Sequence, residues 1–403
     1  MNHLSEDKLI AWFPLKPDER VLTLSAENAA DPYAKLVGGP YDLIIMNGVL
    51  ERLRFEDGLN PAADVMARAK RLLDKDGHLL FTLSNRLGLQ VFAGHPDVRT
   101  GACFKSLERK ISPGYTTRRG LDELCSQAGF DKDCYSVYYP FPSLANISKI
   151  FSDRRLPHVS ECRAKYEDTK YRLFDENLAF DTIIRDGCFP FFANDYVVIY
   201  GPQPEEAFIS YDENENGKIL TTLTKGWVKK RALDEGGKKR LFNIRDNYEK
   251  VSAKYEGTGI HVCPNYETSD DPELGFPFQR GMSLDELMDE RLFEGDIKGF
   301  RGLFEEYVSR ISGTADLEVT CMDMTFDNIV VDGGSWTLTD YEHVAEIKRD
   351  PRALALYALR SYISGDPARL NCDPDALCGR LAVSGEMREK WVAEDEEIMD
   401  KKA

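Results

Sequence analysis

The sequence of 403 residues has little positive charge, few histidines and no long apolar run. Lysine and arginine number 52 against 69 aspartates and glutamates, which gives a net charge of −17 at pH 7. Because nucleic acids and anionic membrane surfaces are polyanions, this balance argues against either of them as a partner. No apolar run approaches the roughly 20 residues that cross a bilayer, and the first residues lack the basic and apolar regions of a secretory signal. The sequence therefore predicts a cytoplasmic protein.

A metal held by sulfur or imidazole is also disfavoured. The 9 cysteines stand singly, with no C-x-x-C pair, and the 6 histidines show no H-E-x-x-H or similar ligand spacing. This usage is typical of reduced thiols and not of disulfides or a zinc site. The chain is long enough for two or three domains that each bury their own core.

The most informative stretch lies between residues 319 and 342. Two β-rich runs flank a short glycine-containing turn, which predicts a hairpin. With Gly334 at the centre of the turn, Asn328 would lie opposite Asp340, with their Cβ atoms about 5 Å apart. An amide and a carboxylate at this spacing suit a hard cation that also binds phosphate oxygens. Asp323 lies one short loop earlier in the sequence. It could therefore act as a base next to the same cation site.

This arrangement of Asp323, Asn328 and Asp340 resembles the catalytic loop and metal-binding hairpin of protein kinases and aminoglycoside-type phosphotransferases. In that family the loop aspartate orients the hydroxyl, and the asparagine and second aspartate bind magnesium. The resemblance implies Asp323 as the catalytic base, Asn328 and Asp340 as metal ligands, and Mg²⁺ and ATP as cofactors. The sequence departs from the pattern at Cys321, where the family usually has histidine, and in lacking Phe-Gly after the second aspartate.

The residues upstream extend the same resemblance. Three short β-rich runs at hairpin spacing between residues 207 and 231 suit the small lobe of a kinase-like fold. The third run carries Lys229 and Lys230, and the resemblance implies that Lys229, or Lys230 in its place, contacts phosphates. Glu249, on the next predicted helix, would pair with that lysine. No G-x-G-x-x-G covers the phosphates, and the turn that would have to serve is acidic, which disfavours nucleotide binding.

The first 150 residues alternate predicted strands and helices. Apolar runs at 20–25, 41–47 and 78–84 are typical of buried strands, and residues 61–73 carry helical spacing. Such alternation predicts a parallel, Rossmann-like sheet.

Residues 41–51 and 71–80 resemble the later half of a class I S-adenosylmethionine (SAM) methyltransferase. Residues 85–94, and after them residues 121–130 and 137–142, resemble methyltransferases encoded with bacterial surface-polysaccharide enzymes, whose chains can continue into a kinase-like domain. In such enzymes a glycine-rich turn follows the first strand and approaches the cofactor, as in other nucleotide-binding sheets. Here only residues 26–40 separate the first two strands, enough for one parallel crossover. The resemblance therefore implies a truncated sheet that has lost the SAM pocket. Glu51 is interpreted as a solvated helix residue.

The patterns together predict an α/β part followed by an α+β part. Residues 1–150 are predicted to form a truncated SAM-methyltransferase-like domain, and residues 151–204 a connecting region. Residues 205–385 are predicted to form a two-lobed kinase-like domain, and residues 386–403 a charged helical tail. The favoured function is phosphoryl transfer from Mg-ATP to a hydroxyl. The resemblance implies a small-molecule or saccharide acceptor of a surface polysaccharide, with polysaccharide-synthesis enzymes as candidate partners.

Two alternatives stay open at this point. One is a SAM-dependent methyltransferase of surface-polysaccharide biosynthesis that binds its cofactor by an altered route. The other is a catalytically inactive pseudoenzyme that serves as a scaffold for partner enzymes. The shortened crossover, Cys321 and the missing glycine-rich loop favour the scaffold.

Overall fold

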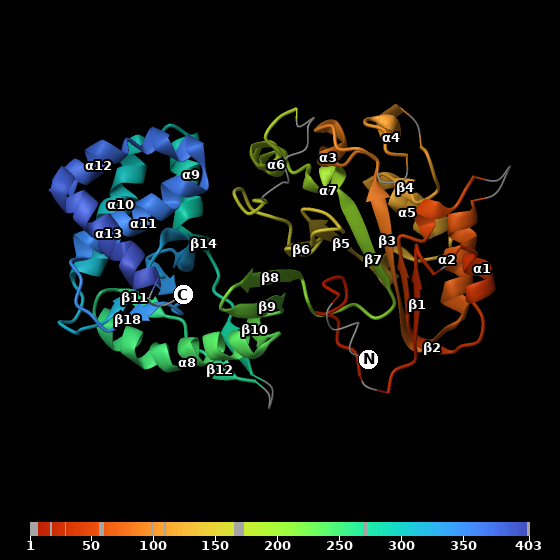
Figure 1. The fold of residues 1–403 in the computed structure, drawn as a ribbon, viewed down its shortest axis with the longest axis horizontal. Helices are drawn as coiled ribbons and strands as arrows, with labels where there is room; N and C mark the ends of the chain where they lie inside the picture. Colours follow the sequence, from red (N-terminus) through yellow and green to blue (C-terminus); the bar gives the residue numbers. More distant parts are fainter. Residues whose placement is uncertain are drawn as a thin grey trace. The chain divides into compact units, whose positions relative to one another are not determined.

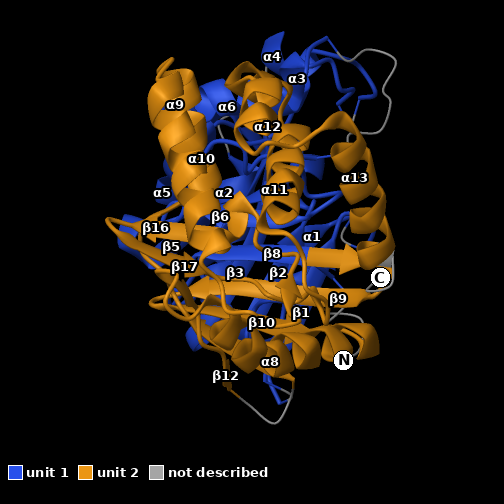
Figure 2. Ribbon diagram, turned by 90° about the vertical axis from the view of Figure 1, so that its left-hand side faces the viewer, with its two compact units in different colours: residues 1–211 blue, residues 212–403 orange. Residues whose placement is uncertain are grey.

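The computed structural model describes residues 7–16, 18–28, 30–55, 60–97, 100–108, 110–164, 173–268 and 272–400. Residues 1–6, which belong to the segment that lacks a secretory signal pattern, lie outside these ranges. The chain divides into two compact units, residues 1–211 and 212–403 (Figure 2), close to the boundary predicted at residue 205. Among the helices within the described ranges, none combines the length and the apolar character of a membrane span.

The sheet of the first unit is parallel at one end and antiparallel at the other (Figure 1). The strand order is β1 (Val21–Ser25), β2 (Tyr41–Asn47), β3 (Leu73–Asn85), β7 (Asp195–Tyr200), β5 (Tyr135–Phe141) and β6 (Lys149–Ser152), with the first residues of β8 (Phe208–Asn214) next to β6. β1, β2 and β3 are parallel, as predicted, and β1 pairs directly with β2. β7 runs antiparallel to both β3 and β5, which the sequence did not predict.

Helices cover this sheet with their apolar faces. α2 (Pro61–Arg71) begins with proline at its first position, where a fixed φ suits the helix. Its residues Val65, Met66 and Ala69 are buried in one core with Phe81 of β3. The remaining short elements of the unit are α1 (Pro32–Lys35), η1 (Leu50–Arg52), α3 (Leu89–Phe92), α4 (Lys105–Glu108), β4 (Tyr115–Thr116), α5 (Arg118–Gln127), η2 (Lys132–Cys134), α6 (Glu176–Arg185) and α7 (Phe189–Phe192).

Residues 151–204, predicted as a connecting region, are instead part of the first unit. β7 has the sequence Asp-Tyr-Val-Val-Ile-Tyr, of which all but the last residue are buried, and it lies between β3 and β5. Phe189 of α7 packs against Phe151 and Phe180, with ring centroids 5.6 and 5.8 Å apart. The segment is integral because an apolar strand of this kind is stable only when both of its faces are covered.

Glu51, interpreted from the sequence as solvated, is buried in η1 directly after β2. Its Oε1 accepts a hydrogen bond from the Ser84 hydroxyl at 3.4 Å. Asp195, at the start of β7, is also buried and accepts the Leu144 N–H at 3.0 Å. Burial raises the pKa of Glu51 to about 8 and the pKa of Asp195 to about 6, because a carboxylate loses hydration in an apolar interior. The first unit thus holds two carboxyl groups that favour the protonated form.

The second unit begins with a small antiparallel sheet. Its strands lie in the order β9 (Gly217–Thr224), β10 (Trp227–Ala232), β13 (Glu273–Pro277) and β12 (Tyr266–Glu267). The long helix α8 (Glu235–Tyr255) packs Leu241 and Ile244 against Ile219 of β9. The strands predicted between residues 207 and 231 are therefore present.

A helical region forms the rest of the second unit. It comprises α9 (Leu284–Phe293), α10 (Ile297–Ser312), α11 (Pro351–Gly365), η4 (Pro367–Cys372), α12 (Pro374–Arg380) and α13 (Gly385–Asp400). Figure 1 shows these helices gathered at the end of the unit away from α8. Between the two regions lie short ladders and turns: β11 (Ile260–Val262), β14 (Met282–Ser283), β15 (Thr320–Cys321), η3 (Phe326–Asn328), β16 (Ile329–Asp332), β17 (Ser335–Leu338) and β18 (Val344–Ala345).

The carboxy-terminal helix α13, predicted as a charged tail, packs on the helical region. Trp391 is only 7% exposed and lies in a cluster with Ala353 and Leu356 of α11. Arg349 and Asp395 form an ion pair whose two side chains are almost fully buried. At least one charged residue of α13, Asp395, thus forms a buried ion pair within the unit. Composition alone did not predict this contact.

The buried Glu51 gives the first prediction. Because its pKa lies above the ordinary value of 4.5, the folded protein retains a proton that the unfolded chain releases. The free energy of unfolding should therefore fall as pH rises from about 5 to about 8 and then level off. Glu51→Gln keeps the shape of the side chain and removes this titration. Its melting temperature should exceed that of the wild type at pH 8 and match it near pH 5, as measured by circular dichroism.

Glu123→Gln is the matched control, because Glu123 is exposed on α5 and pairs with the exposed Arg119. It should leave the pH dependence of melting unchanged. A wild-type slope in Glu51→Gln would show that Glu51 is ionised in the folded protein. The slope that remains below pH 6 in this variant is assigned to Asp195.

Candidate functional site

Asp323 lies beside a histidine that comes from a different strand. β15 and β18 pair antiparallel, and the Met322 N–H donates to the His343 carbonyl at 2.8 Å just beyond this ladder, which places Asp323, the next residue, beside His343. Asp323 Oδ2 accepts the backbone N–H of His343 at 2.6 Å, and Asp323 Oδ1 lies 2.8 Å from His343 Nδ1. Two contacts to one residue fix the orientation of the carboxylate. Sequence reasoning noted the missing histidine at residue 321 and did not identify His343.

The charges of this pair are coupled. Burial, together with the negative charge of Asp340, raises the pKa of Asp323 despite the hydrogen bonds from His343. The hydrogen bond to Asp323 raises the pKa of His343 above its ordinary value. Groups that interact this closely take up and release protons as a unit. Asp323 and His343 are therefore best treated as one acid–base pair.

The predicted hairpin is present, but its register differs by one residue from the prediction. Gly333 and Gly334 form a two-residue turn, and Gly333 has φ of 57°, as hairpin turns of this length require. Asn328 consequently faces Thr339, whose N–H donates to the Asn328 carbonyl at 2.8 Å. Asp340 lies one position further along. The expected direct opposition of Asn328 and Asp340 is therefore wrong, because the turn is shorter than a loop centred on Gly334.

The side chain of Asn328 is oriented by its own loop. Its amide nitrogen donates to the Asp323 carbonyl at 3.0 Å and to the Thr325 hydroxyl at 3.1 Å. Both N–H donors are thus used, and the amide oxygen is the atom that Asn328 can offer to a ligand. The bond to Asp323 also ties the two predicted site residues together.

Asp340 is held by a lysine from the small sheet. Lys230 Nζ lies 2.6 Å from Asp340 Oδ2, and the lysine side chain is only 15% exposed. The other oxygen of Asp340 accepts the Tyr341 N–H at 2.9 Å. Burial lowers the pKa of Lys230, but the carboxylate of Asp340 and the more distant Glu342 and Asp323 outweigh it and raise the pKa. The lysine is therefore a fixed positive charge in the site.

The lysine that reaches Asp340 is Lys230 and not Lys229. Successive side chains of a strand point to opposite faces, so only one of the two can face this site. Glu249, predicted to pair with the lysine, is exposed on α8, opposite the buried face that includes Arg240. Among the described contacts, Glu249 makes no ion pair. The expected lysine–glutamate pair is thus replaced by the contact between Lys230 and Asp340.

A second ion pair, which sequence reasoning missed, attaches α8 to the segment after Asp340. Arg240 binds Glu342 through two bonds, Nε to Oε1 at 2.6 Å and Nη2 to Oε2 at 2.9 Å. The two side chains are 7% and 9% exposed. Asn247, two turns further along α8, donates to the carbonyls of Tyr341 and Glu342 at 3.1 and 3.0 Å. The only sequence signal was Glu342 itself, in a position where the kinase pattern has glycine.

The turn before β9 packs against α8 and does not form an open loop. Gly217 has φ of 134°, and a Cβ there would meet the backbone of Gly236 and Gly237 within 2.2 Å. Arg240 Nη1 also donates to the Gly217 carbonyl at 3.2 Å. The glycine is required here by close packing of the turn on the helix.

The oxygen donors of the site suit a hard cation only with help from a ligand. Within the described parts of the chain, no group of three or more histidine, cysteine, aspartate or glutamate residues is arranged to hold a metal ion. The Asn328 amide oxygen and the Asp340 carboxylate would hold Mg²⁺ if phosphate oxygens and water completed its shell. Lys230 would then exchange its bond to Asp340 for one to a phosphate.

No protein-family model matches the chain, and no curated protein matches it. Similar solved structures include the ADP-bound aminoglycoside phosphotransferase APH(2'')-Ib, with 11% identity over 46% of this chain and 90% of that chain and a TM-score of 0.23. A choline/ethanolamine kinase family protein from Mesorhizobium loti has 11% identity over 48% and 92%, with a TM-score of 0.23. The Rio2 kinase from Chaetomium thermophilum, complexed with ADP/Mg²⁺-phosphoaspartate, has 10% identity over 59% and 81%, with a TM-score of 0.24. At these values the matches carry no structural argument, and the roles assigned below rest on the contacts of this chain.

The buried pair of Arg240 and Glu342 gives the second prediction. Arg240→Met leaves Glu342 buried without its counter-charge, which should lower the free energy of unfolding by about 3–5 kcal/mol. The double variant Arg240→Met/Glu342→Gln should recover much of this loss, because it removes both charges. Urea denaturation of the four proteins of the double-mutant cycle measures the coupling.

Arg245→Met is the matched control on the same helix. Arg245 pairs only with exposed carboxylates, Asp246 and Glu267, and such surface pairs contribute little. A loss in Arg240→Met as small as that in Arg245→Met would contradict the structural importance of the buried pair.

Proposed function

We propose that the second unit binds Mg-ATP and transfers the γ-phosphoryl group to a hydroxyl of an acceptor. The observation that carries this proposal is the contact of Lys230 with Asp340. This contact brings together a lysine, which is a common phosphate ligand, and an aspartate, which is a common metal ligand, although 110 residues of sequence separate them. Asn328 and Asp323 belong to the same loop, and the Asn328 side-chain amide donates a hydrogen bond to the Asp323 carbonyl. A lysine, a carboxylate, an amide oxygen and a second carboxylate form the set that phosphoryl transfer uses.

Each residue has a defined role in this proposal. Lys230 takes the role assigned from the sequence to Lys229 and binds phosphate oxygens. Asn328 and Asp340 would hold Mg²⁺, and the bound ion would neutralise charge on the phosphates. Asp323 accepts the proton of the acceptor hydroxyl. In balance, a bond forms between the acceptor oxygen and the γ-phosphorus, the bond to the bridging oxygen of ADP breaks, and the hydroxyl proton passes to Asp323.

His343 is a positioning residue in this scheme. Its two contacts hold both oxygens of Asp323, and a base must be held in orientation to act at the acceptor. Arg240 and Asn247 act one step further out, since they hold the backbone that carries Asp340 and His343.

The first unit, we propose, is a reduced methyltransferase-like sheet that has lost its cofactor site. In support, β1 pairs directly in parallel with β2, and α1, with four residues, is the only helix in the described part of the crossover between them. This leaves no room for a glycine-rich turn and two further strands. The surface-polysaccharide acceptor remains a proposal drawn from the same sequence resemblance.

A second candidate function is a scaffold without catalysis, and one observation favours it. Lys230 and Tyr341 occupy both oxygens of Asp340, so a metal ion at Asp340 must compete with the lysine ammonium. If ATP does not draw Lys230 away, the site is a stable structural ion pair. Nucleotide binding therefore separates the two functions.

Mg-ATP binding is the third prediction. At a concentration about 100 times its Kd, Mg-ATP should stabilise the wild type by about 2.7 kcal/mol, seen as a rise of several degrees in melting temperature. Asp340→Asn and Lys230→Met should each reduce this rise strongly. Lys229→Met should keep it, because Lys229 lies on the other face of β10. The absence of a rise in the wild type would contradict phosphoryl transfer and leave the scaffold.

Asp323→Asn separates binding from chemistry and is the fourth prediction. The melting shift with Mg-ATP should remain near that of the wild type, because Asp323 is not assigned to the nucleotide. Turnover should fall by about 100-fold or more, since a positioned base acts in the transition state. ADP release is measured with and without an acceptor. Equal turnover in Asp323→Asn and wild type would rule out Asp323 as the base.

The first unit should not bind SAM, and this is the fifth prediction. Calorimetric titration of the full chain with SAM should give no heat above dilution at micromolar concentration. Micromolar affinity would contradict the proposal of a lost pocket and restore the methyltransferase function.

A further inference from the structure

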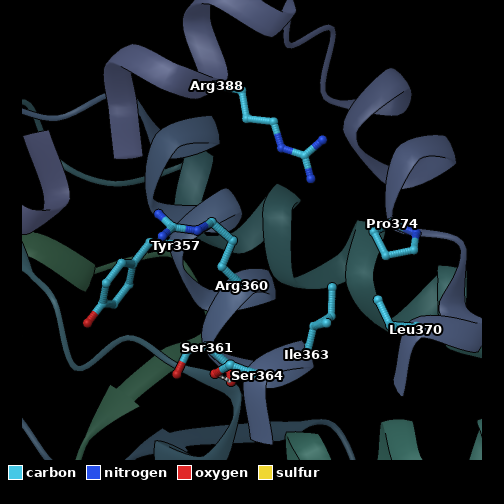
Figure 3. Close-up of a pocket in the computed structure, with 8 residues that line it drawn as sticks. All are labelled: Tyr357, Arg360, Ser361, Ile363, Ser364, Leu370, Pro374 and Arg388. Carbon is cyan, nitrogen blue, oxygen red and sulfur yellow. Dashed lines mark hydrogen bonds between the residues drawn. The ribbon is translucent and has the colours of Figure 1, made fainter. Parts of the chain in front are cut away.

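A cavity of about 460 Å³ lies beside α11 in the second unit (Figure 3). It is bounded by α11, η4, α12 and α13, all of them in the helical region. Its volume lies within the range of small-molecule sites, roughly 300–1,000 Å³. The site residues described above do not line it.

The polar lining of this cavity combines two guanidinium groups with three hydroxyls. Tyr357, Ser361 and Ser364 recur at helical spacing on α11 and so share one side of the helix. Arg360 comes from the same helix, and Arg388 comes from α13. Figure 3 shows the side chain of Arg388 reaching from α13 into the space beside α11. The Ser364 hydroxyl already donates to the Ser361 carbonyl at 2.8 Å and can offer a ligand only an acceptor. The two guanidinium groups offer N–H donors from two helices.

Both arginines retain capacity to bind an anion. Arg360 Nη1 lies 3.4 Å from Asp395 Oδ2, and Arg388 Nη1 lies 3.2 Å from Asp375 Oδ1. A guanidinium has five N–H donors, and these are the hydrogen bonds that the two groups make among the described residues. Asp395 is already paired with Arg349, and Asp375 is 91% exposed, so neither carboxylate is a strong partner for the cavity arginines.

The rest of the lining is apolar. Ile363, Leu370 and Pro374 contribute hydrocarbon surface, and Leu370 is 59% exposed although it is large and apolar. A sugar ring presents C–H groups on its faces and hydroxyls at its edge, so it matches apolar residues beside serine and tyrosine. Paired guanidinium groups match a phosphate or a carboxylate, which they bind through parallel hydrogen bonds.

Tyr357 connects this cavity to the site of Asp323. α11 packs directly on the loop that follows Asp323, with the rings of Tyr362 and Phe326 5.6 Å apart. Burial raises the pKa of Tyr357, and the negative charge of Asp323 adds to the rise. The cavity therefore begins on the helix that also supports the proposed base.

We propose that this cavity binds the acceptor of the phosphoryl transfer, and that the acceptor is a saccharide bearing an anionic group, phosphate or carboxylate. The inference rests on the proposed function and adds the class of substrate to it. Arg360 and Arg388 bind the anionic group, and the hydroxyls of α11 bind the ring. A free hydroxyl of the saccharide attacks the γ-phosphorus of ATP and loses its proton to Asp323, which yields ADP and the phosphorylated saccharide.

Calorimetry on the full chain tests the acceptor class with four probes: glucose 6-phosphate, glucuronate, glucose and inorganic phosphate. Glucose 6-phosphate or glucuronate should bind at least about tenfold more tightly than glucose and than phosphate, since each alone lacks half of the contacts. The stronger of the two shows whether phosphate or carboxylate is preferred. Equal binding of glucose, or failure of both anionic sugars to bind, would overturn the proposal.

Arginine variants locate the binding. Arg388→Gln and Arg360→Gln should each weaken the Kd of the preferred sugar about tenfold or more, because each removes a charge-assisted hydrogen bond. Arg291→Gln, on the partly exposed Arg291 of α9, is the control and should leave the Kd unchanged. Melting temperature confirms that each variant is folded. A wild-type Kd in both cavity variants would overturn the assignment of the site.

Transfer assays separate failure of the acceptor class from failure of phosphoryl transfer. With labelled ATP, the preferred sugar should be phosphorylated by the wild type and about tenfold less efficiently by Arg388→Gln, mainly through KM. Transfer to an uncharged sugar that is insensitive to Arg388→Gln would overturn the acceptor class and keep the phosphotransferase. Arginine-dependent sugar binding without Mg-ATP binding would overturn the proposed function, and with it the acceptor role, while the cavity would remain a site for anionic saccharides.

Discussion

The ion pair of Arg240 with Glu342 is the contact on which the geometry of the second unit depends. Both side chains are nearly buried, so each needs the other. Through this pair and the bonds of Asn247, α8 holds the backbone from Tyr341 to His343. That segment carries Asp340 to Lys230 on one side and His343 to Asp323 on the other. The helix that supports the small sheet therefore also orients the two carboxylates of the candidate site.

Each carboxylate of this site has a basic partner. Lys230 bonds to Asp340, and His343, which is positive only when its imidazole is protonated, bonds to Asp323. A nucleotide with its cation brings both signs of charge and offers Lys230 a new partner without leaving Asp340 uncompensated. The proposed phosphoryl transfer and a closed structural ion pair would thus use the same residues. The difference between them lies in whether the phosphates compete successfully for Lys230.

The two units use buried polar groups in different ways. In the first unit, burial raises the pKa of Glu51 and the pKa of Asp195, which favours their protonated forms. In the second unit, buried carboxylates such as Glu342 are matched by buried cations.

The sequence by itself determined the local elements: the strands at 21–25 and 41–47, the hairpin before Asp340, and Asp323 in a loop near them. These depend on apolar alternation and turn residues, which act between neighbours in the chain. Only the tertiary structure decided that Lys230 and not Lys229 faces the site, because a shift of one residue in strand register exchanges the two faces of a strand. Packing also decided that Glu51 is buried, that the strand at 195–200 completes the first sheet, and that Arg240 meets Glu342 across 102 residues. Partners so far apart leave no periodic signal in the sequence, since the space between elements selects them.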